Sequence, residues 1–287
     1  MDREATQDEI DVKNRAFWSE LCGSSLAKHL GVVDSSIESL TKFDNYYMDY
    51  YPYLRNYLPV ENMTGKKVLE VGLGYGTVGQ YIASHGADYH GLDISQNAVD
   101  MTNHRLRQNR LEGQAIVGSV LNSNFPDNYF DYVISIGCFH HTGNMQKCID
   151  ETYRMLKPGG QAIIMVYNKF SLRQWAKWPV QTAKNLILQK SNQIKATKTS
   201  SKQRKAYDAT SDKKIGAPET EFYSVNDINK IFSIFEQVKT TRENFDDYFL
   251  SFGISRIHLF GFGPRIKYLD SKLVSQFGLD LYIQAIK

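Results

Sequence analysis

The chain has 287 residues, of which 42% are hydrophobic and 23% are charged. These values are typical of a globular protein, and the length fits one large domain with additions or one domain with a cap. The formal net charge of +3 is too small to indicate a nucleic-acid partner. The three cysteines, Cys22, Cys138 and Cys148, are far apart in the sequence, so they predict neither a disulfide framework nor a metal site.

Residues 1–15 are polar and acidic and do not resemble a signal peptide. No stretch of the sequence approaches the roughly 20 apolar residues that are needed to span a bilayer. We therefore expect a cytoplasmic protein.

Residues 1–64 are expected to form an N-terminal helical cap. Apolar residues in segment 13–30 recur near helical spacing. Segment 43–58 carries six tyrosines, at positions 46, 47, 50, 51, 53 and 57. Because aromatic faces attract cations, these rings are candidates for contact with a cationic ligand, but we expect most of them to pack within the cap.

From residue 65 the pattern changes to strands that alternate with helices. Short apolar runs predict the strands and amphipathic stretches predict the helices. The predicted elements are a strand at 67–71, a helix at 76–85, a strand at 89–93, a helix at 95–109, strands at 115–118 and 130–136, a helix at 144–157 and a strand at 161–168. Pro158, Gly159 and Gly160 are expected to stop the helix at 144–157. Residues 65–168 are thus predicted to be the ligand-binding half of an α/β core.

Residues 169–221 interrupt this alternation and are predicted to form a basic insertion or lid. Between residues 171 and 217 there are eleven Lys and Arg residues and two Asp residues. Segment 171–188 mixes Trp, Leu and Ile with basic residues, which fits an amphipathic lid or a surface that contacts membranes or acidic substrates. A solvated insertion without a partner is the third interpretation.

The alternation resumes over residues 222–287, which we expect to be the second half of the core. A helix capped by Ser224 is predicted at 224–235, and strands are predicted at 236–241 and 279–286. Alternating strands and helices indicate the α/β class, with a doubly wound and mostly parallel sheet. The ligand of such a sheet lies beyond the carboxyl ends of the strands, where the strand order reverses.

The first motif, VLEVGLGYG at 68–76, follows the first strand of this core. Its glycines permit a tight turn and allow a ligand to lie against backbone N–H groups at a helix N-terminus. Dinucleotide-binding proteins have GxGxxG spacing, whereas here an acid precedes GxGxG. This form favours a nucleoside with an amino acid tail. The candidate binding residues are Glu70, Gly72, Gly74, Tyr75 and Gly76.

Two further motifs follow the next two strands. Asp93 ends the second strand, where a carboxylate can accept hydrogen bonds from both ribose hydroxyls of a nucleoside. A helix-capping role is the simpler alternative for Asp93. Ser119, in VGSV at 117–120, can contact the edge of the base, although ordinary turn chemistry explains it nearly as well.

The fourth motif, at 125–144, is an apolar strand that ends at Gly137 and is followed by Cys138-Phe-His-His141. This segment lies where a substrate would meet the bound nucleoside. His140 and His141 are candidates for a general base near neutral pH. An equally open interpretation is that they shape the pocket or cap the next helix. Two histidines without a third spaced ligand do not predict a metal site.

These four motifs, in this order and spacing, resemble the class I S-adenosylmethionine-dependent methyltransferases. The resemblance covers residues 66–168 and, more loosely, 222–287. Within that family, FDYVISIGCFHHT and YRMLKPGGQAIIMVYN look like the fourth and fifth motifs of the branch that includes the ubiquinone- and menaquinone-biosynthesis methyltransferases.

The resemblance implies a seven-stranded, Rossmann-like sheet with an antiparallel last strand, and S-adenosylmethionine as the cofactor. Glu70, Gly72 and Gly74 would line the methionine part of the cofactor, and Asp93 would hold the ribose. The other implied contacts are Ile94, Ser119 and Val120 beside adenine, and the backbone of Ile136 and Gly137 beside the methionine amino group. Many relatives have Asp where Ser119 stands, so the adenine amino group is held differently if it binds here.

The expected reaction is a direct in-line displacement at the sulfonium methyl group, in which the enzyme aligns the acceptor and excludes water. The aromatic cap and segment 171–188 favour a small and fairly apolar or lipid-like acceptor, methylated on oxygen, nitrogen or carbon. Three alternatives stay open: a methyltransferase that acts on RNA or protein through the basic insertion, a nicotinamide oxidoreductase, and a non-catalytic relative that only binds S-adenosylmethionine. The glycine spacing disfavours the oxidoreductase.

Overall fold

A computed structural model describes residues 5–20, 22–189, 199–210, 215–244, 248–252, 255–260 and 271–287. Parts of the predicted insertion and of the predicted second half of the core therefore lie outside the described residues. Seven strands form one sheet, in the order β3-β2-β1-β4-β5-β9-β6. They are β1 (Lys67–Val71), β2 (Asp88–Asp93), β3 (Gln114–Val117), β4 (Phe130–Ile136), β5 (Leu156–Tyr167), β6 (Gln237–Glu243) and β9 (Asp280–Ile286).

The last strand in the chain, β9, lies between β5 and β6 and runs antiparallel to both. The strands from β3 to β5 pair in parallel. The expected doubly wound α/β sheet with an antiparallel last strand is therefore confirmed. Strand order reverses beside β1, where β2 and β4 lie on opposite sides, which marks the site for a ligand.

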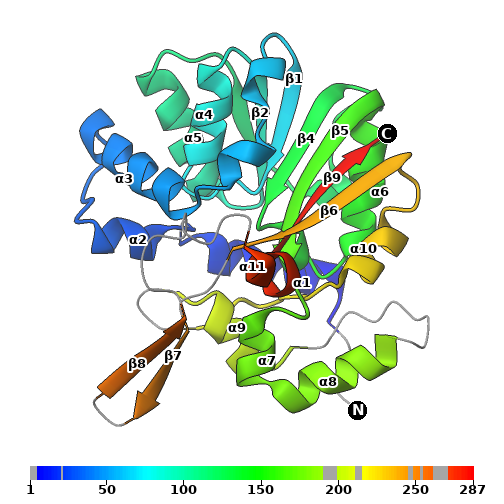
Figure 1. Cartoon of the computed structure of the whole chain (residues 1–287). Helices are drawn as coiled ribbons and strands as arrows, with labels where there is room; N and C mark the ends of the chain where they lie inside the picture. Colours follow the sequence, from blue (N-terminus) through cyan, green and yellow to red (C-terminus); the bar gives the residue numbers. More distant parts are fainter. Residues whose placement is uncertain are drawn as a thin grey trace.

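Helices cover both faces of the sheet (Figure 1). Helices α4 (Thr77–Ser84) and α5 (Gln96–Gln108) lie on one face, and α6 (Met145–Met155) and α10 (Val225–Ile231) lie on the other. Successive residues of a strand point to opposite faces. Accordingly, Val68 belongs to the buried cluster that contains α4, and its neighbour Leu69 belongs to the cluster that contains α6.

The N-terminal segment forms a cap of short helices rather than one long helix. Its elements are α1 (Gln7–Trp18), α2 (Ser24–His29), α3 (Ile37–Tyr50) and the 3₁₀ turns η1 (Leu54–Tyr57) and η2 (Val60–Asn62). Segment 13–30 is broken between α1 and α2, where Gly23 has a φ of 104°. This backbone conformation favours glycine, so the helical spacing in the sequence does not continue through it.

Buried polar contacts join the cap to the core. Asp44 on α3 accepts hydrogen bonds from Arg105 Nη1 at 2.8 Å and from Thr77 Oγ1 at 2.7 Å. The Arg105 side chain is fully buried, and the Asp44 side chain is only 17% exposed. The cap is thereby fixed over the glycine-rich turn that begins α4.

The insertion contributes α7 (Leu172–Lys177), α8 (Pro179–Leu188) and α9 (Ser201–Tyr207), and it lies at the same end of the sheet as the cap (Figure 1). A two-stranded hairpin, β7 (Tyr248–Phe252) with β8 (Ser255–Phe260), and a short helix, α11 (Lys272–Phe277), precede β9. This hairpin was not predicted from the sequence.

The boundary between α6 and β5 differs from the prediction. Helix α6 ends at Met155, and Leu156 already has extended backbone and pairs with Phe130. Pro158 disfavours helical backbone at the residue before it, so the chain enters the strand early. Gly159 and Gly160 therefore lie within β5 instead of between the helix and the strand.

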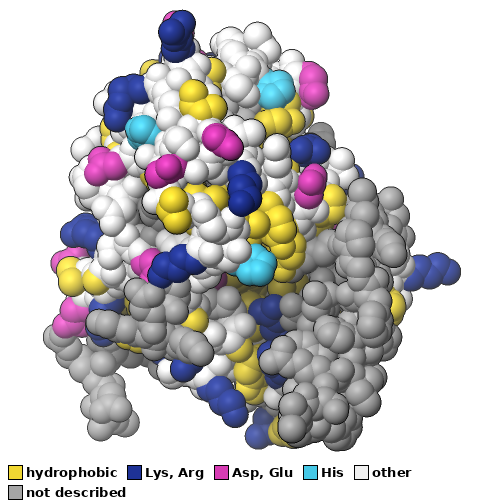
Figure 2. Space-filling view, turned by 90° about the vertical axis from the view of Figure 1, so that its left-hand side faces the viewer, with side chains coloured by type: hydrophobic (Ala, Val, Ile, Leu, Met, Phe, Trp, Pro, Cys, Tyr) yellow, Lys and Arg dark blue, Asp and Glu magenta, His cyan; other side chains and the backbone are white. Residues whose placement is uncertain are grey.

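Acidic and basic side chains are interspersed over the upper part of the face shown in Figure 2. Such a mixture is typical of a solvated surface, whereas several Lys and Arg side chains gather in the lower part of the same view. Within the part of the chain that the structure describes, no helix combines the length and the apolar character that crossing a membrane requires.

Candidate functional site

A cavity of about 570 Å³ lies at the carboxyl ends of the central strands. It is lined by residues that directly follow or end β1, β2, β4 and β5, namely Gly72, Asp93, Gly137 and Tyr167. The cap and the insertion line it as well. This is the position in which an open α/β sheet binds its ligand.

The glycine-rich turn forms one wall of this cavity. Gly72, Gly74 and Gly76 have φ values of 85°, 53° and 78°, which favour glycine at each position. A Cβ at Gly72 would overlap the side chain of Cys138, whose Sγ would be 2.9 Å away. The turn and the end of β4 thus approach closely because Gly72 lacks a side chain. Gly76 begins α4 but is not among the residues that line the cavity.

Glu70 is a buried carboxyl group beneath this turn. It accepts a hydrogen bond of 2.6 Å from the Tyr89 hydroxyl. Burial raises the pKa of Glu70 to about 8, the Tyr89 hydrogen bond opposes this rise, and the charge of Asp93 adds to it. A carboxyl group with this pKa is protonated at neutral pH, so it offers an O–H donor as well as an acceptor oxygen to a ligand that reaches the turn.

Asp93 is held by the backbone at the end of β2. Its Oδ2 accepts a hydrogen bond of 2.7 Å from the Leu73 N–H, and its Oδ1 accepts one of 2.8 Å from the Ser95 N–H. Burial raises the pKa of Asp93, and these backbone N–H groups oppose the rise. The contacts fix the carboxylate at the cavity and link it to the glycine-rich turn.

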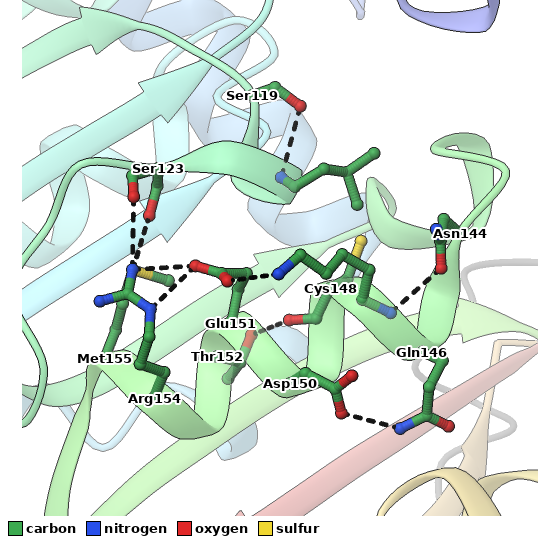
Figure 3. A network of polar contacts seen from close by, with 12 residues as sticks. Ser119, Ser123, Asn144, Gln146, Cys148, Asp150, Glu151, Thr152, Arg154 and Met155 are labelled. Atoms are coloured by element: carbon green, nitrogen blue, oxygen red, sulfur yellow. Dashed lines mark hydrogen bonds and ion pairs between the residues drawn. The ribbon is translucent and has the colours of Figure 1, made fainter. Parts of the chain in front are cut away.

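The segment after β3 forms another wall. Ser119 lines the cavity, and its Oγ accepts a 3.3 Å hydrogen bond from the Leu121 N–H, which caps the 3₁₀ turn η3 (Val120–Asn122) (Figure 3). Arg154 on α6 donates to the carbonyl oxygens of Ser123 and Phe125. Through Arg154, helix α6 therefore holds this segment in place.

The two histidines after β4 have different surroundings. Both lie in the 3₁₀ turn η4 (Phe139–His141). His140 is fully buried, is not among the cavity-lining residues, and has its ring 4.2 Å from the ring of Tyr167. Burial lowers its pKa well below the ordinary range, with a further contribution from His141, so its ring is neutral at physiological pH.

His141 lines the cavity and is held from two sides. Its Nδ1 lies 2.7 Å from the carbonyl oxygen of Glu219, and its Nε2 lies 3.5 Å from Oδ2 of Asp208. A carbonyl oxygen only accepts hydrogen bonds, so Nδ1 carries a proton and Nε2 is the basic nitrogen of the neutral ring. Asn14 also donates to the His141 carbonyl oxygen, at 2.7 Å.

The insertion supplies cavity residues that were not predicted from the sequence. Asp208 follows α9 and lines the cavity, and the single proton of the Tyr167 hydroxyl is shared between its two carboxylate oxygens, each 3.1 Å away. Arg173 lies over the Tyr207 ring, 4.4 Å from its centre, and both residues line the cavity. One signal pointed to Asp208: it is one of only two acids in an otherwise basic segment.

The structure brings most of the predicted site residues into this one cavity. The cavity-lining residues from the prediction are Glu70, Gly72, Gly74, Tyr75, Asp93, Ile94, Ser119, Val120, Ile136, Gly137 and His141. Five of the six tyrosines of segment 43–58 also line it, and Tyr57 instead stacks on Tyr282. These residues suit S-adenosylmethionine for two reasons. The turn at Gly72 has no room for a Cβ, which would overlap Cys138, and the carboxylate of Asp93 is held in place at the same cavity.

Segment 171–188 forms α7 and α8. Val180, Leu186, Ile187 and Leu188 are exposed on α8. Lys177 and Lys184 are exposed beside them. Contact of this surface with a membrane stays a prediction.

Residues 69–164 match the family described as "Methyltransferase domain". The chain is similar to phosphoethanolamine N-methyltransferase of Plasmodium falciparum, with 33% identity over 40% of this chain and 44% of that one. It is also similar to ubiquinone biosynthesis O-methyltransferase of Pseudomonas fluorescens, with 31% identity over 38% of this chain and 47% of that one. The chain spans less than half the length of these curated relatives.

The fold is shared with an S-adenosylmethionine-dependent methyltransferase of Mesorhizobium loti. That structure has 12% sequence identity and a TM-score of 0.51, over 83% of this chain and 98% of that one. The expected fold is confirmed by this likeness, and the expected cofactor by the family match. Residues 69–164 are thus similar to known methyltransferase domains.

Proposed function

We propose that the chain transfers a methyl group from S-adenosylmethionine to a small acceptor held in the cavity. The observation that carries this proposal is the shared space: the glycine-rich turn, Asp93 and Ser119 line the same cavity as His141 and Tyr167. The first group suits a nucleoside with an amino acid tail, and the second group offers a proton acceptor and an aromatic wall.

The cofactor would be held by the walls described above, and it supplies a methyl group activated by the positive charge of a sulfonium. Glu70 and the glycine-rich turn would bind its amino acid part, and Asp93 its ribose. The remaining proposed contacts are Tyr75, Gly76, Ile94, Ser119, Val120, Ile136 and Gly137. Gly76 would act through the start of α4, since it does not line the cavity.

The residues of the chain have three tasks on the acceptor side: to orient the acceptor, to exclude water and to accept a proton where one must be lost. The cap and the insertion enclose the space. His141 is our candidate for the base, because its Nδ1 faces the Glu219 carbonyl oxygen and its Nε2, 3.5 Å from Asp208 Oδ2, is the nitrogen that can accept a proton. His140, which is buried behind Tyr167, is assigned the pocket-shaping role that the sequence also allowed.

The acceptor is proposed to have an apolar or aromatic body. The aromatic residues that line the cavity support this choice: Trp18, Phe43, Tyr46, Tyr47, Tyr50, Tyr51, Tyr53, Tyr75, Tyr167, Tyr207 and Tyr282. The similarity to the ubiquinone relative supports kinship with the quinone branch.

A transfer assay tests this proposal. The protein is incubated with S-adenosylmethionine labelled on its methyl group, together with either a metabolite extract filtered to small molecules or a mixture of RNA and protein. With the wild type we expect the label to appear in a small molecule other than S-adenosylmethionine. With Asp93→Ala we expect no such labelled product. Label confined to RNA or protein would favour action through the basic insertion, and no transfer to any fraction would favour a non-catalytic binding protein.

A further inference from the structure

The cavity has an acidic lining. Among the described residues that line it there are five acids, Asp11, Glu70, Asp93, Asp208 and Asp280, and a single Lys or Arg, which is Arg173. Glu70 is protonated near neutral pH because burial raises its pKa to about 8. The other four acids also face the cavity. Burial raises the pKa of Asp93 and of Asp208, and for Asp208 the charges of His141 and Arg173 and the Tyr167 hydrogen bond oppose the rise. A cationic cofactor accounts for part of this charge, but two of these carboxylates come from elements other than those that carry the expected cofactor residues.

Asp208 and Asp280 are these two carboxylates. The expected cofactor residues follow β1 to β4, whereas Asp208 comes from the insertion and Asp280 begins β9. Both act electrostatically on the Tyr167 hydroxyl, at the end of β5. Asp280 also accepts a 2.9 Å hydrogen bond from Asn244 Nδ2, which holds its carboxylate in place.

Asp208 is held in place by two residues of the cavity. The Tyr167 hydroxyl is 3.1 Å from each of its oxygens, and His141 Nε2 is 3.5 Å from Oδ2.

Aromatic rings lie beside the partners of this carboxylate, and the Arg173 guanidinium already lies over the Tyr207 ring, 4.4 Å from its centre. The ring centres of Tyr167 and Tyr207 are 4.8 Å apart, and those of Trp18 and His141 are 4.9 Å apart. Aromatic faces attract cations, and a nearby carboxylate strengthens the same preference. A phenolate or another developing anion would be repelled by the carboxylates at this end.

We propose that the acceptor atom is the nitrogen of a primary or secondary amine, which binds as an ammonium group against Asp208 beside the rings of Trp18 and Tyr167. This inference rests on the proposed methyl transfer and names its acceptor class. The ammonium loses one proton to Nε2 of His141, which passes it to solvent. The nitrogen lone pair that is left is then free to act as the nucleophile.

Calorimetric titration of matched probes tests the inference. The full chain is first titrated with S-adenosylhomocysteine, and the saturated protein is then titrated with 2-phenylethylamine, 2-phenylethanol or phenylacetate. The three probes share an apolar body and differ in charge. We expect the amine to bind at least tenfold more tightly than the alcohol, and the anion to bind most weakly.

Asp208→Asn is expected to weaken the amine about tenfold and to leave binding of the alcohol unchanged. Asp150→Asn is the matched control, because Asp150 is an exposed carboxylate on α6 that contacts only Gln146 among the residues drawn in Figure 3. Equal binding of the three probes, no binding of any, or an amine affinity unaffected by Asp208→Asn would overturn the inference. If S-adenosylhomocysteine binds while these results fail, only the amine assignment is lost; if it does not bind, the proposed function fails first.

Discussion

Replacement of Gly72 by Ala tests how the glycine-rich turn is built. At a φ of 85° an Ala residue carries a backbone cost of about 1–2 kcal/mol. Its Cβ would also overlap Cys138, and overpacking of a tight site costs about 1–3 kcal/mol. The sum is about 2–5 kcal/mol, which corresponds to a fall in Tm of roughly 4–20 °C. Because Cys138 follows β4 at the cavity, we also expect weaker binding of S-adenosylhomocysteine.

Gly65→Ala is the matched control for this variant. Gly65 has a φ of 67°, but a Cβ there would meet nothing within 4 Å. It should lose only the backbone cost of about 1–2 kcal/mol and keep its ligand affinity. Thermal unfolding followed by circular dichroism and calorimetry with S-adenosylhomocysteine measure the two effects. Equal losses of stability in the two variants, or unchanged ligand affinity in Gly72→Ala, would refute the close approach of the turn to β4.

Three further changes probe buried charges. Burial raises the pKa of Glu70 from 4.5 to about 8. The protonated side chain therefore contributes its full stabilisation below about pH 4.5, and this contribution is lost as the pH rises through 8. In urea titrations, Glu70→Gln should flatten the decline in unfolding free energy between about pH 5 and 9. Asp227→Asn should cost about 3–5 kcal/mol in the same assay, because it leaves the buried ammonium of Lys169 without the carboxylate now 2.6 Å away, and a loss below 1 kcal/mol would contradict this. Asp44→Ala should speed amide hydrogen exchange in residues 37–50 relative to 96–108, because it removes the partner of buried Arg105; unchanged exchange would show that this pair does not fix the cap.

The core of the fold was predictable because local sequence and global topology agree there. The apolar run at 67–71 ends in glycines and becomes β1 with its turn, and the strand predicted at 279–286 becomes the antiparallel β9. Asp93 could be placed at the cavity because the end of a parallel strand fixes its position next to the end of β1. Ser224 caps α10 as its position before an amphipathic stretch indicates.

The acceptor side was less predictable because it is assembled from segments far apart in the chain. Nothing local in the sequence says that Asp208 approaches His141 and Tyr167, which lie 67 and 41 residues away. Likewise, adjacent histidines do not reveal which ring faces the cavity, since that depends on the 3₁₀ turn that places His140 behind Tyr167. Spacing within one motif predicts a ligand-binding turn, but the substrate site depends on tertiary packing.

Calorimetric titration with S-adenosylhomocysteine, with NADH as the control ligand, tests the central claim most directly. The account predicts binding of S-adenosylhomocysteine, at least tenfold weaker binding in Asp93→Ala, and no response to NADH. Absence of S-adenosylhomocysteine binding, or binding of NADH in its place, would contradict the assignment of this cavity to S-adenosylmethionine.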